Sequence, residues 1–396
     1  MPQPSVDALG GGPRLDHLTM LQSQGSFASS SGSADGFEGM SLEARFGPIA
    51  HVTTRPQVDN EGGASGGSAA PSSGRSKSRG SSHAAREIQV VGGISELYEL
   101  GAEVMPSTHS YMKVLFATRL SDSLQVVIKV RYKPKCFRSR EDERSWRHNS
   151  EFLMNLPANV GVATLYEVIE DPKAFYIIME KVNGMDLFET LEAEGRISMS
   201  MAREILRQLL TSLIHLHQHN AVHKDLKLEN VMYDTGQGGS KSSAGLSQVK
   251  VIDFDTVEEW TPSSPIAKDV VGTDQYISQE AYAGKYSPLS DIFAVGVVAY
   301  RLLSGKFPFH DGMFDDKAGE NWVGSPTMAQ IRRRLKNTKV DFTVHAVFRD
   351  NPEACDLVTR MLAYAQDSRP TAAAALEHPW FTEARSRSTS KLASDD

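Results

Sequence analysis

The order of apolar and polar residues divides the chain into three stretches. Residues 1–87 consist mainly of Gly, Ser, Ala and short polar runs, without regular apolar spacing. Such a stretch buries too little apolar surface to offset the entropy lost on ordering, so we predict that it is disordered. Residues 88–381 have the pattern of a folded domain. Residues 382–396 are rich in Ser and Arg and are predicted to form a disordered tail.

The first part of the folded stretch has the pattern of β-strands. Runs of β-branched and aromatic residues are separated by turn-like residues, which is typical of short strands. These runs occupy residues 97–100, 111–116, 125–130 and 174–179. Between them, residues 139–156 form a charged stretch that fits one amphipathic helix.

The second part has the pattern of helices. Apolar residues recur three and four positions apart between Ile205 and Leu216, which predicts a long helix with one apolar face. Residues 290–303 are more uniformly apolar and fit a helix buried on most sides. Two polar insertions, residues 236–247 and 311–325, are predicted to be surface loops.

Strands followed by helices predict an α+β fold with two unlike lobes. We place a small β-rich N-lobe at about residues 95–180 and a larger α-helical C-lobe at about residues 184–381.

The composition limits the cellular compartments and the kinds of partner that we expect for the protein. With 40% apolar and 23% charged residues, the chain can bury a sizeable core. It has no run of about 18 uncharged apolar residues, no signal sequence and no myristoylation glycine, so we expect no membrane attachment. Its two cysteines, Cys136 and Cys355, form no metal or disulfide pattern, which fits a reducing compartment. The net charge of −7 argues against a nucleic-acid partner. We expect an intracellular, cytoplasmic protein, with the nucleus as the open alternative.

One loop carries a carboxylate, an ammonium and an amide within six positions: Asp225, Lys227 and Asn230. Phosphoryl transfer needs a carboxylate to orient and deprotonate the attacking hydroxyl, a cation near the moving phosphate, and a metal ligand beside it. Farther along, Asp253 follows an apolar strand-like run, which places its carboxylate well for Mg²⁺. The two segments together argue against a chance polar loop.

Lys129 lies in a strand that we expect to be buried. An unpaired ammonium is costly there, so Lys129 needs an anionic partner, either a phosphate or a carboxylate.

Further short motifs follow one another through the rest of the domain. They are Val126–Lys129, His223–Asp225, Asp253–Asp255, Gly272–Thr273, Ser278–Glu280, Asp291 with Gly296, Asp367–Ala372 and His378–Phe381. In this order they resemble the motifs of eukaryotic protein kinases, and they are most similar to the calcium/calmodulin-dependent and calcium-dependent kinase group. The resemblance implies the bilobal protein kinase fold over residues 88–381. It also implies that Arg369 pairs with Glu280 and that Asp291 lies on the buried helix that anchors the catalytic loop.

The resemblance implies a role for each group in the use of ATP and Mg²⁺. Asp225 is the implied catalytic base, and Lys227 is the cation near the γ-phosphate. Asn230 and Asp253 are the implied Mg²⁺ ligands, and Lys129 contacts the α- and β-phosphates.

The resemblance also implies that a helix glutamate pairs with the phosphate-binding lysine. We choose Glu151 because an apolar edge follows it, and Glu141 and Glu143 remain open. Other residues fall where the adenine ring would bind. They are Val114, Val127, Met179, Glu180, Val182 and Met232.

The substrate class follows from the same resemblance. Lys227 together with Thr273 is the pattern of serine/threonine kinases, whose partners are protein substrates. Asp186 and Glu229 occupy positions that bind arginine before the phosphoacceptor in kinases preferring basic substrates. The alternative is that both carboxylates only solvate the surface.

The departures from the family pattern lie around ATP. Ser107, His109 and Met112 stand where the phosphate-covering loop has glycines, which let the backbone approach phosphate closely. Val127 replaces an alanine above the adenine and adds two methyl groups to a tight pocket. Asp255 replaces the glycine after Phe254 and adds a carboxylate near the metal.

Lys224 replaces the arginine beside the catalytic aspartate and loses bidentate recognition of phosphate. These departures keep a second hypothesis open, namely a pseudokinase that binds partners with weak or no turnover. The sequence contains no 12-residue acidic calcium loop, so we expect no intrinsic calcium site. We presume a monomer.

Overall fold

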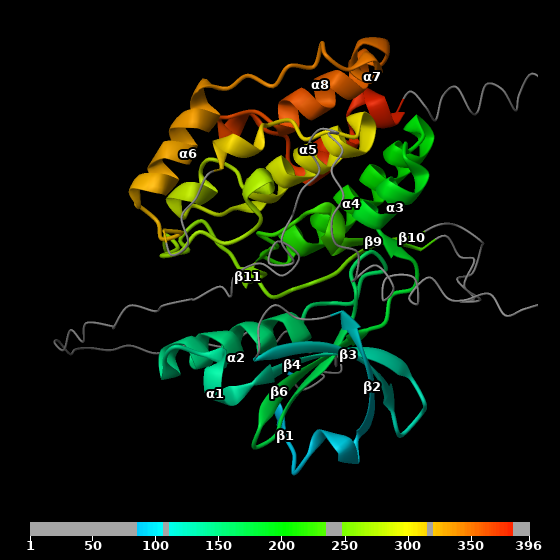
Figure 1. Ribbon diagram of the computed structural model, residues 1–396, viewed down its shortest axis with the longest axis vertical. Helices are drawn as coiled ribbons and strands as arrows, with labels where there is room; N and C mark the ends of the chain where they lie inside the picture. The colour runs from blue at the N-terminus through cyan, green and yellow to red at the C-terminus, as the bar shows by residue number, and fades with distance from the viewer. Residues whose placement is uncertain (1–84, 106–110, 235–247, 315–319, 383–396) are drawn as a thin grey trace, which may run out of the picture. The chain divides into compact units, whose positions relative to one another are not determined.

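The computed structural model describes residues 85–105, 111–234, 248–314 and 320–382 (Figure 1). Several predictions fall outside these ranges. They are the disorder of nearly all of residues 1–87 and 382–396, the loop at 236–247, and the loop positions Ser107 and His109.

Within the described residues, six strands form one sheet in the order β1-β5-β6-β4-β3-β2. Neighbouring strands are antiparallel, except that β1 runs parallel to β5. The strands are β1 Gln89–Val90, β2 Tyr98–Met105, β3 Met112–Arg119, β4 Gln125–Tyr132, β5 Leu165–Glu170 and β6 Ala174–Glu180. The four strands predicted from sequence are β2, β3, β4 and β6, and each is confirmed and continues further at its C-terminal end.

The side chains of β4 divide between the two faces of the sheet. Val126, Ile128 and Val130 are buried in the apolar cluster on one face. Because side chains alternate along a strand, Lys129 and Arg131 point to the other face. Two basic residues of one strand therefore lie side by side on the face that the helix α2 covers.

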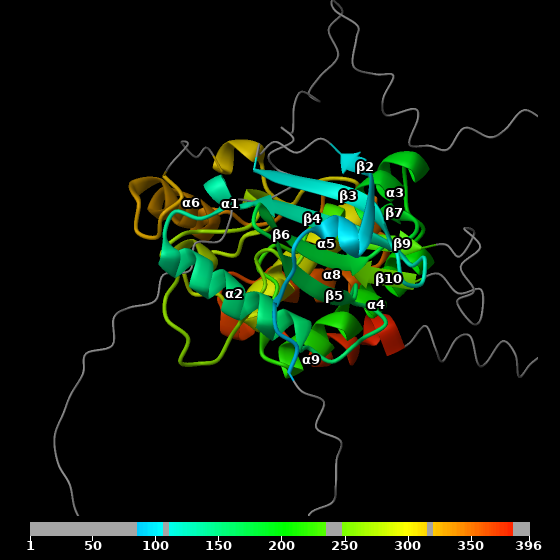
Figure 2. The same ribbon diagram turned by 90° about the horizontal axis from the view of Figure 1, so that it is seen from below.

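Helix α1 (Lys133–Cys136) and helix α2 (Arg140–Met154) belong to the same lobe, and Figure 2 shows α2 along one side of the strands. Ser139 caps α2 by accepting a hydrogen bond of 3.1 Å from the backbone N–H of Asp142. Arg147 joins the helix to Glu170 of β5 through a 2.7 Å ion pair. The predicted amphipathic helix is confirmed.

The second lobe is built mainly of helices (Figure 1). They are α3 Leu187–Glu194, α4 Met199–Gln218, α5 Pro288–Ser304, α6 Pro326–Asn337, α7 Ala346–Asp350, α8 Pro352–Met361 and α9 Ala372–Leu376. The sheet lobe and the helical lobe form the bilobal α+β fold that the sequence predicts. In the part of the chain that the structure describes, no helix is both long and apolar enough to cross a membrane.

The two helices predicted from apolar spacing are α4 and α5. The apolar stripe of α4, from Ile205 to Leu216, is fully buried, as its spacing predicts. Helix α5 is buried on nearly all sides, as its uniform apolar sequence predicts. A capping box between Ser287 and Ser290 begins α5, and Gly305, with φ of 74°, ends it.

Two small sheets hold the segments that carry the predicted catalytic residues. Strands β7 (Met185–Asp186), β9 (Val231–Asp234) and β10 (Gln248–Val251) form one of them. Strands β8 (Ala221–Val222) and β11 (Glu258–Glu259) form the other. The loop between β8 and β9 and the loop between β10 and β11 therefore start and end on paired strands.

The insertion at residues 311–325 is not a free surface loop in its described part. The backbone of Asn321 accepts a 2.7 Å hydrogen bond from Val270, and Val323 donates one of 2.7 Å to Lys268. Ser325 is fully buried and caps α6. The described part thus remains a largely surface-exposed segment, as predicted, but its backbone also pairs with a distant segment, which the polar side chains did not reveal.

Candidate active site

The loop between β8 and β9 is held in place by the buried carboxylate of Asp291. Asp291 of α5 is 1% exposed and accepts 3.0 Å hydrogen bonds from the backbone N–H groups of His223 and Lys224. His217 of α4 reaches the same carboxylate at 2.9 Å. These bonds hold Lys224 at φ of 69°, a left-handed conformation that a lysine adopts only when its surroundings impose it. The predicted anchoring role of Asp291 is confirmed.

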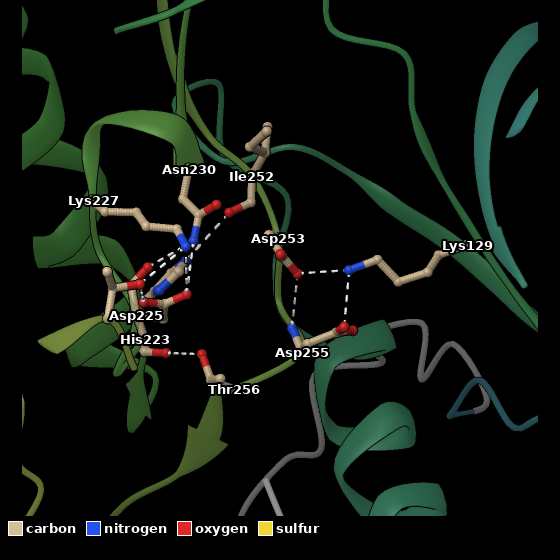
Figure 3. Close-up of polar contacts among 10 residues, drawn as sticks. Lys129, His223, Asp225, Lys227, Asn230, Ile252, Asp253, Asp255 and Thr256 are labelled. Carbon is tan, nitrogen blue, oxygen red and sulfur yellow. Dashed lines mark hydrogen bonds and ion pairs between the residues drawn. The ribbon is translucent and has the colours of Figure 1, made fainter. Parts of the chain in front are cut away.

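Three of the predicted residues, Asp225, Lys227 and Asn230, lie close together in Figure 3, and the hydroxyl of Thr273 joins them. Asp225 accepts a 2.8 Å hydrogen bond from the hydroxyl of Thr273, and this hydroxyl accepts one of 3.0 Å from Lys227. The ammonium of Lys227 lies 3.5 Å from the Asp225 carboxylate. Asn230 donates through its amide nitrogen to the backbone oxygen of Asp225 at 2.7 Å and to its carboxylate at 3.3 Å. The carboxylate is therefore oriented from three sides.

A second cluster joins the two lobes. The ammonium of Lys129 lies 2.8 Å from Asp253 and 2.9 Å from Asp255 (Figure 3). Asp253 has φ of 62°, and its carboxylate also accepts a 3.3 Å hydrogen bond from the backbone N–H of Asp255. Burial disfavours the charged form of Lys129, but the two carboxylates outweigh it and raise the pKa of the ammonium.

Arg131 completes this cluster, and it lies outside the motifs that the sequence revealed. Its side chain is 1% exposed, its Nη2 lies 3.3 Å from the Asp255 carboxylate, and its guanidinium lies 5.6 Å from the ring centre of Trp146. Burial raises the pKa of Asp255, but Lys129 and Arg131 outweigh it and lower the pKa to about 2. Spacing was the available signal, because residues two apart in a strand share a face.

The prediction that Glu151 pairs with Lys129 is not met in this structure. Glu151 lies on another face of α2, in a groove that it lines with Ala85, His148 and Asn155. The face of α2 that packs inward carries Ser150 and Met154 instead. Each residue turns a helix by about 100°, so one position is enough to move a carboxylate out of the site. Glu143, an alternative partner, is paired with Arg147 at 2.8 Å.

The residues predicted to surround adenine lie on neighbouring strands. Val114 of β3 faces Lys129 in the strand register, and Val127 of β4 faces Met179 of β6. Val182 follows β6, and Met232 lies on β9 opposite Asp186. The side chain of Glu180 turns away from this row, because it binds Lys250 at 2.6 Å and the backbone N–H of Thr164 at 3.1 Å. Met112, at a position where the family has glycine, is the buried first residue of β3.

The segment after Asp255 is fastened to both lobes. Strand β11 pairs with β8 beside the catalytic loop, and Glu258 of β11 forms an ion pair with Lys224. Asn149 of α2 donates a 2.6 Å hydrogen bond to the backbone oxygen of Val257. The ammonium of Lys224 also lies 4.8 Å from the ring centre of Tyr286. Lys224 therefore has a carboxylate partner within the chain.

We expect the substitution Glu258→Gln to loosen this segment. The ammonium of Lys224 is 5% exposed and would lose its charged partner. Amide hydrogen exchange at residues 257–260 should accelerate several-fold, because local opening becomes easier. The matched control is Glu259→Gln, since Glu259 is the next residue of the same short strand and lies in the groove beside His148. Equal exchange rates in the two variants would contradict the role of the ion pair.

The helical lobe contains the predicted buried ion pair. Arg369 donates to the two carboxylate oxygens of Glu280 at 2.6 Å and 3.0 Å, and its side chain is fully buried. The pair that the motifs imply is confirmed, and it fixes the end of the segment that carries Thr273.

Comparison with known proteins decides the family. Residues 110–381 match the protein kinase domain. The chain belongs to the protein kinase family. The matched stretch begins just before β3 and ends at Phe381, and the strands β1 and β2 before it pair into the same sheet as β3. The bounds 88–381 stay a prediction.

Several relatives of this kinase share the predicted group. Calcium-dependent protein kinase 4 of Plasmodium berghei is 29% identical over 69% of this chain and 47% of that relative. Calcium-dependent protein kinase 34 of Arabidopsis thaliana is 30% identical over 72% of this chain and 49% of its own length. A CaM kinase-like vesicle-associated protein of Xenopus laevis is 29% identical over 73% of this chain and 71% of its length. The predicted group is confirmed, and the chain spans about half the length of the calcium-dependent relatives.

The two acidic residues predicted to read the substrate lie on different elements of the kinase. Asp186 caps α3 by accepting a 2.8 Å hydrogen bond from the backbone N–H of Glu189. Glu229 lies in the short turn after Lys227, near the buried ring of Tyr276. Burial, and then the negative charge of Glu229, raise the pKa of Tyr276. Asp186 therefore has a structural role as the cap of α3, and its contact with a substrate stays a prediction.

Proposed function

We propose that this kinase transfers the γ-phosphate of ATP to serine and threonine hydroxyls of proteins. The observation that carries the proposal is the joined geometry of Asp225, Lys227 and Thr273, with Asn230 beside them. Lys227 together with Thr273 is also the family pattern of serine/threonine kinases, which supports an aliphatic hydroxyl as acceptor. The pseudokinase alternative gains no support from the family match or from the names of the relatives.

The chain's own residues supply positioning and charge. Asp225 orients the attacking hydroxyl and accepts its proton, because its carboxylate is buried and held by Thr273 and Asn230. Lys227, which is fully buried, places a positive charge beside that carboxylate and near the transferring group. Lys129 holds the nucleotide from the sheet lobe.

The residues present fit Mg²⁺ bound with ATP. Mg²⁺ prefers oxygen ligands and takes most of its shell from phosphate and water, so one or two protein side chains suffice. Asp253 offers a carboxylate, and Asn230 offers its amide oxygen, since its amide nitrogen is already bonded to Asp225. When bound, Mg²⁺ neutralises charge on the phosphates.

The proposal is tested with purified protein, Mg-ATP and a peptide array of matched Ser, Thr and Tyr acceptors. We expect phosphate incorporation on Ser and Thr and little on Tyr. Incorporation that is confined to Tyr would overturn the substrate class. No incorporation on any acceptor, despite binding of Mg-ADP, would favour the pseudokinase alternative.

We further propose a preference for arginine three residues before the phosphoacceptor. A guanidinium can form charge-assisted hydrogen bonds with Asp186 and Glu229. Such a contact is worth about 1–3 kcal/mol, which is roughly a 5- to 150-fold preference. Glu229→Gln should reduce the ratio of kcat/KM for Arg-x-x-Ser over Ala-x-x-Ser peptides, and adding Asp186→Asn should reduce it further.

The design of these variants separates charge from folding. Asparagine is as good an N-cap as aspartate, so Asp186→Asn keeps the start of α3 and removes only the charge. The control is Glu192→Gln, a charge-neutralising change on the same helix. An unchanged peptide preference in the double variant would show that the two carboxylates do not read the substrate.

A further inference from the structure

Asp255 occupies an unusual place between two cations of one strand. Its Oδ2 atom lies 2.9 Å from the ammonium of Lys129 and 3.3 Å from the guanidinium of Arg131. Lys129 and Arg131 are 4% and 1% exposed in their side chains, whereas Asp255 is 26% exposed. One carboxylate from the segment after β10 therefore joins two buried cations of β4.

The buried guanidinium of Arg131 depends on the carboxylate of Asp255 for its ion pair. The Nε and Nη1 atoms of Arg131 are buried without a hydrogen-bond partner, so Nη2 carries its ion pair. A buried charge that loses its partner is strongly destabilising. Two cations and two carboxylates, Asp253 and Asp255, balance one another here.

The two carboxylates are not equivalent. Asp253 is the carboxylate that fits Mg²⁺, so in a nucleotide complex its oxygen atoms would bind the metal ion as well as Lys129. Asp255 is tied to Arg131 as well as to Lys129, which fixes it to β4 independently of any metal. The helix glutamate that we expected, Glu151, lies outside the cluster.

We propose that Asp255 is a positioning residue that holds Lys129 ready for the nucleotide phosphates, with Arg131 fixing Asp255 in place. This inference rests on the proposed use of ATP. In this arrangement the segment after β10 supplies a carboxylate that orients Lys129. Asp255, which replaces the glycine of the family pattern, then strengthens nucleotide binding, and the substitution Asp255→Gly weakens it.

The first test measures nucleotide binding, not turnover. In calorimetric titrations with Mg-ADP, Asp255→Gly and Asp255→Asn should each raise Kd about tenfold. The matched control is Asp122→Asn, because Asp122 is also bound to an arginine of the same sheet, Arg119, at 2.6 Å but is 49% exposed. Unchanged or tighter binding by the Asp255 variants would overturn the proposal.

A second variant separates positioning from stability. Asp255→Asn leaves Arg131 as a buried charge, so the melting temperature without nucleotide should fall. Adding Arg131→Met removes that charge and should recover the melting temperature while Kd for Mg-ADP stays raised. Recovery of both quantities would mean that Asp255 acts only on stability, which overturns the positioning role.

A third measurement does not need nucleotide at all. An ammonium held between two carboxylates reacts slowly with acetic anhydride, so Lys129 should be acetylated several-fold faster in Asp255→Gly than in the unsubstituted protein. Peptide mass spectrometry of the nucleotide-free protein measures the rate of acetylation at Lys129. Failure of the unsubstituted protein to bind Mg-ADP would sink the proposed function, whereas equal acetylation of Lys129 in both proteins would sink the role of Asp255.

Discussion

Asp225→Asn is expected to reduce the rate of peptide phosphorylation by at least two orders of magnitude. An asparagine amide has nearly the shape of the carboxylate but cannot accept the proton of the attacking hydroxyl. It also removes the negative charge 3.5 Å from Lys227. A positioned acid–base group contributes typically 10²- to 10⁴-fold, which sets this estimate. The measurement is kcat/KM with Mg-ATP and a Ser peptide that the unsubstituted protein phosphorylates.

A control must show that the rate of Asp225→Asn falls because the proton transfer is impaired, and not because the variant unfolds or binds nucleotide more weakly. We expect Kd for Mg-ADP to change little, because Lys129 and Asp253 lie in the other cluster. Thr273→Ser is a mild companion variant, since it retains the hydroxyl that donates to Asp225. Equal phosphate incorporation by the Asp225→Asn variant and the unsubstituted protein would contradict the enzymatic proposal.

Asp291→Ala is expected to produce the largest loss of stability. It leaves the backbone N–H groups of His223 and Lys224 without their acceptor inside the helical lobe. Each unsatisfied buried donor costs about 1–3 kcal/mol, so we expect the free energy of unfolding to fall by about 2–6 kcal/mol. Urea denaturation followed by circular dichroism measures this change. Peptide phosphorylation should fall with it, because the catalytic loop loses its anchor.

A surface carboxylate provides the control for this second prediction. Asp356 is 48% exposed and pairs with Arg360 and His378 at 2.8 Å and 2.9 Å. Exposed ion pairs contribute about 0–1 kcal/mol, so Asp356→Ala should be nearly neutral. If Asp291→Ala were no more destabilising than Asp356→Ala, the anchoring of the catalytic loop by α5 would be refuted.

Local patterns in the sequence determined four of the six strands in the large sheet, the helices α2, α4 and α5, and the order of the catalytic motifs. The apolar stripe of α4 and the uniform apolar run of α5 were readable because 3.6-residue periodicity reports burial directly. Asp225, Lys227 and Asn230 were readable because they lie within one short loop. The pair between Arg369 and Glu280 is distant in sequence, and only the resemblance to a family connected its members.

Tertiary structure alone decided which charges meet around Lys129. From sequence, Glu151 was the chosen partner and Glu141 and Glu143 remained open, because a helix pattern does not say which face of the helix turns to a neighbouring strand. In the folded protein Glu151 lines a groove outside the cluster. Asp255, which is 126 residues away from Lys129 in the chain, lies 2.9 Å from the Lys129 ammonium. The partner of a buried charge is chosen by how two lobes close on each other, and no local periodicity records that choice. The same holds for the insertion at residues 311–325, whose pairing with Lys268 and Val270 depends on backbone groups that side-chain patterns do not describe.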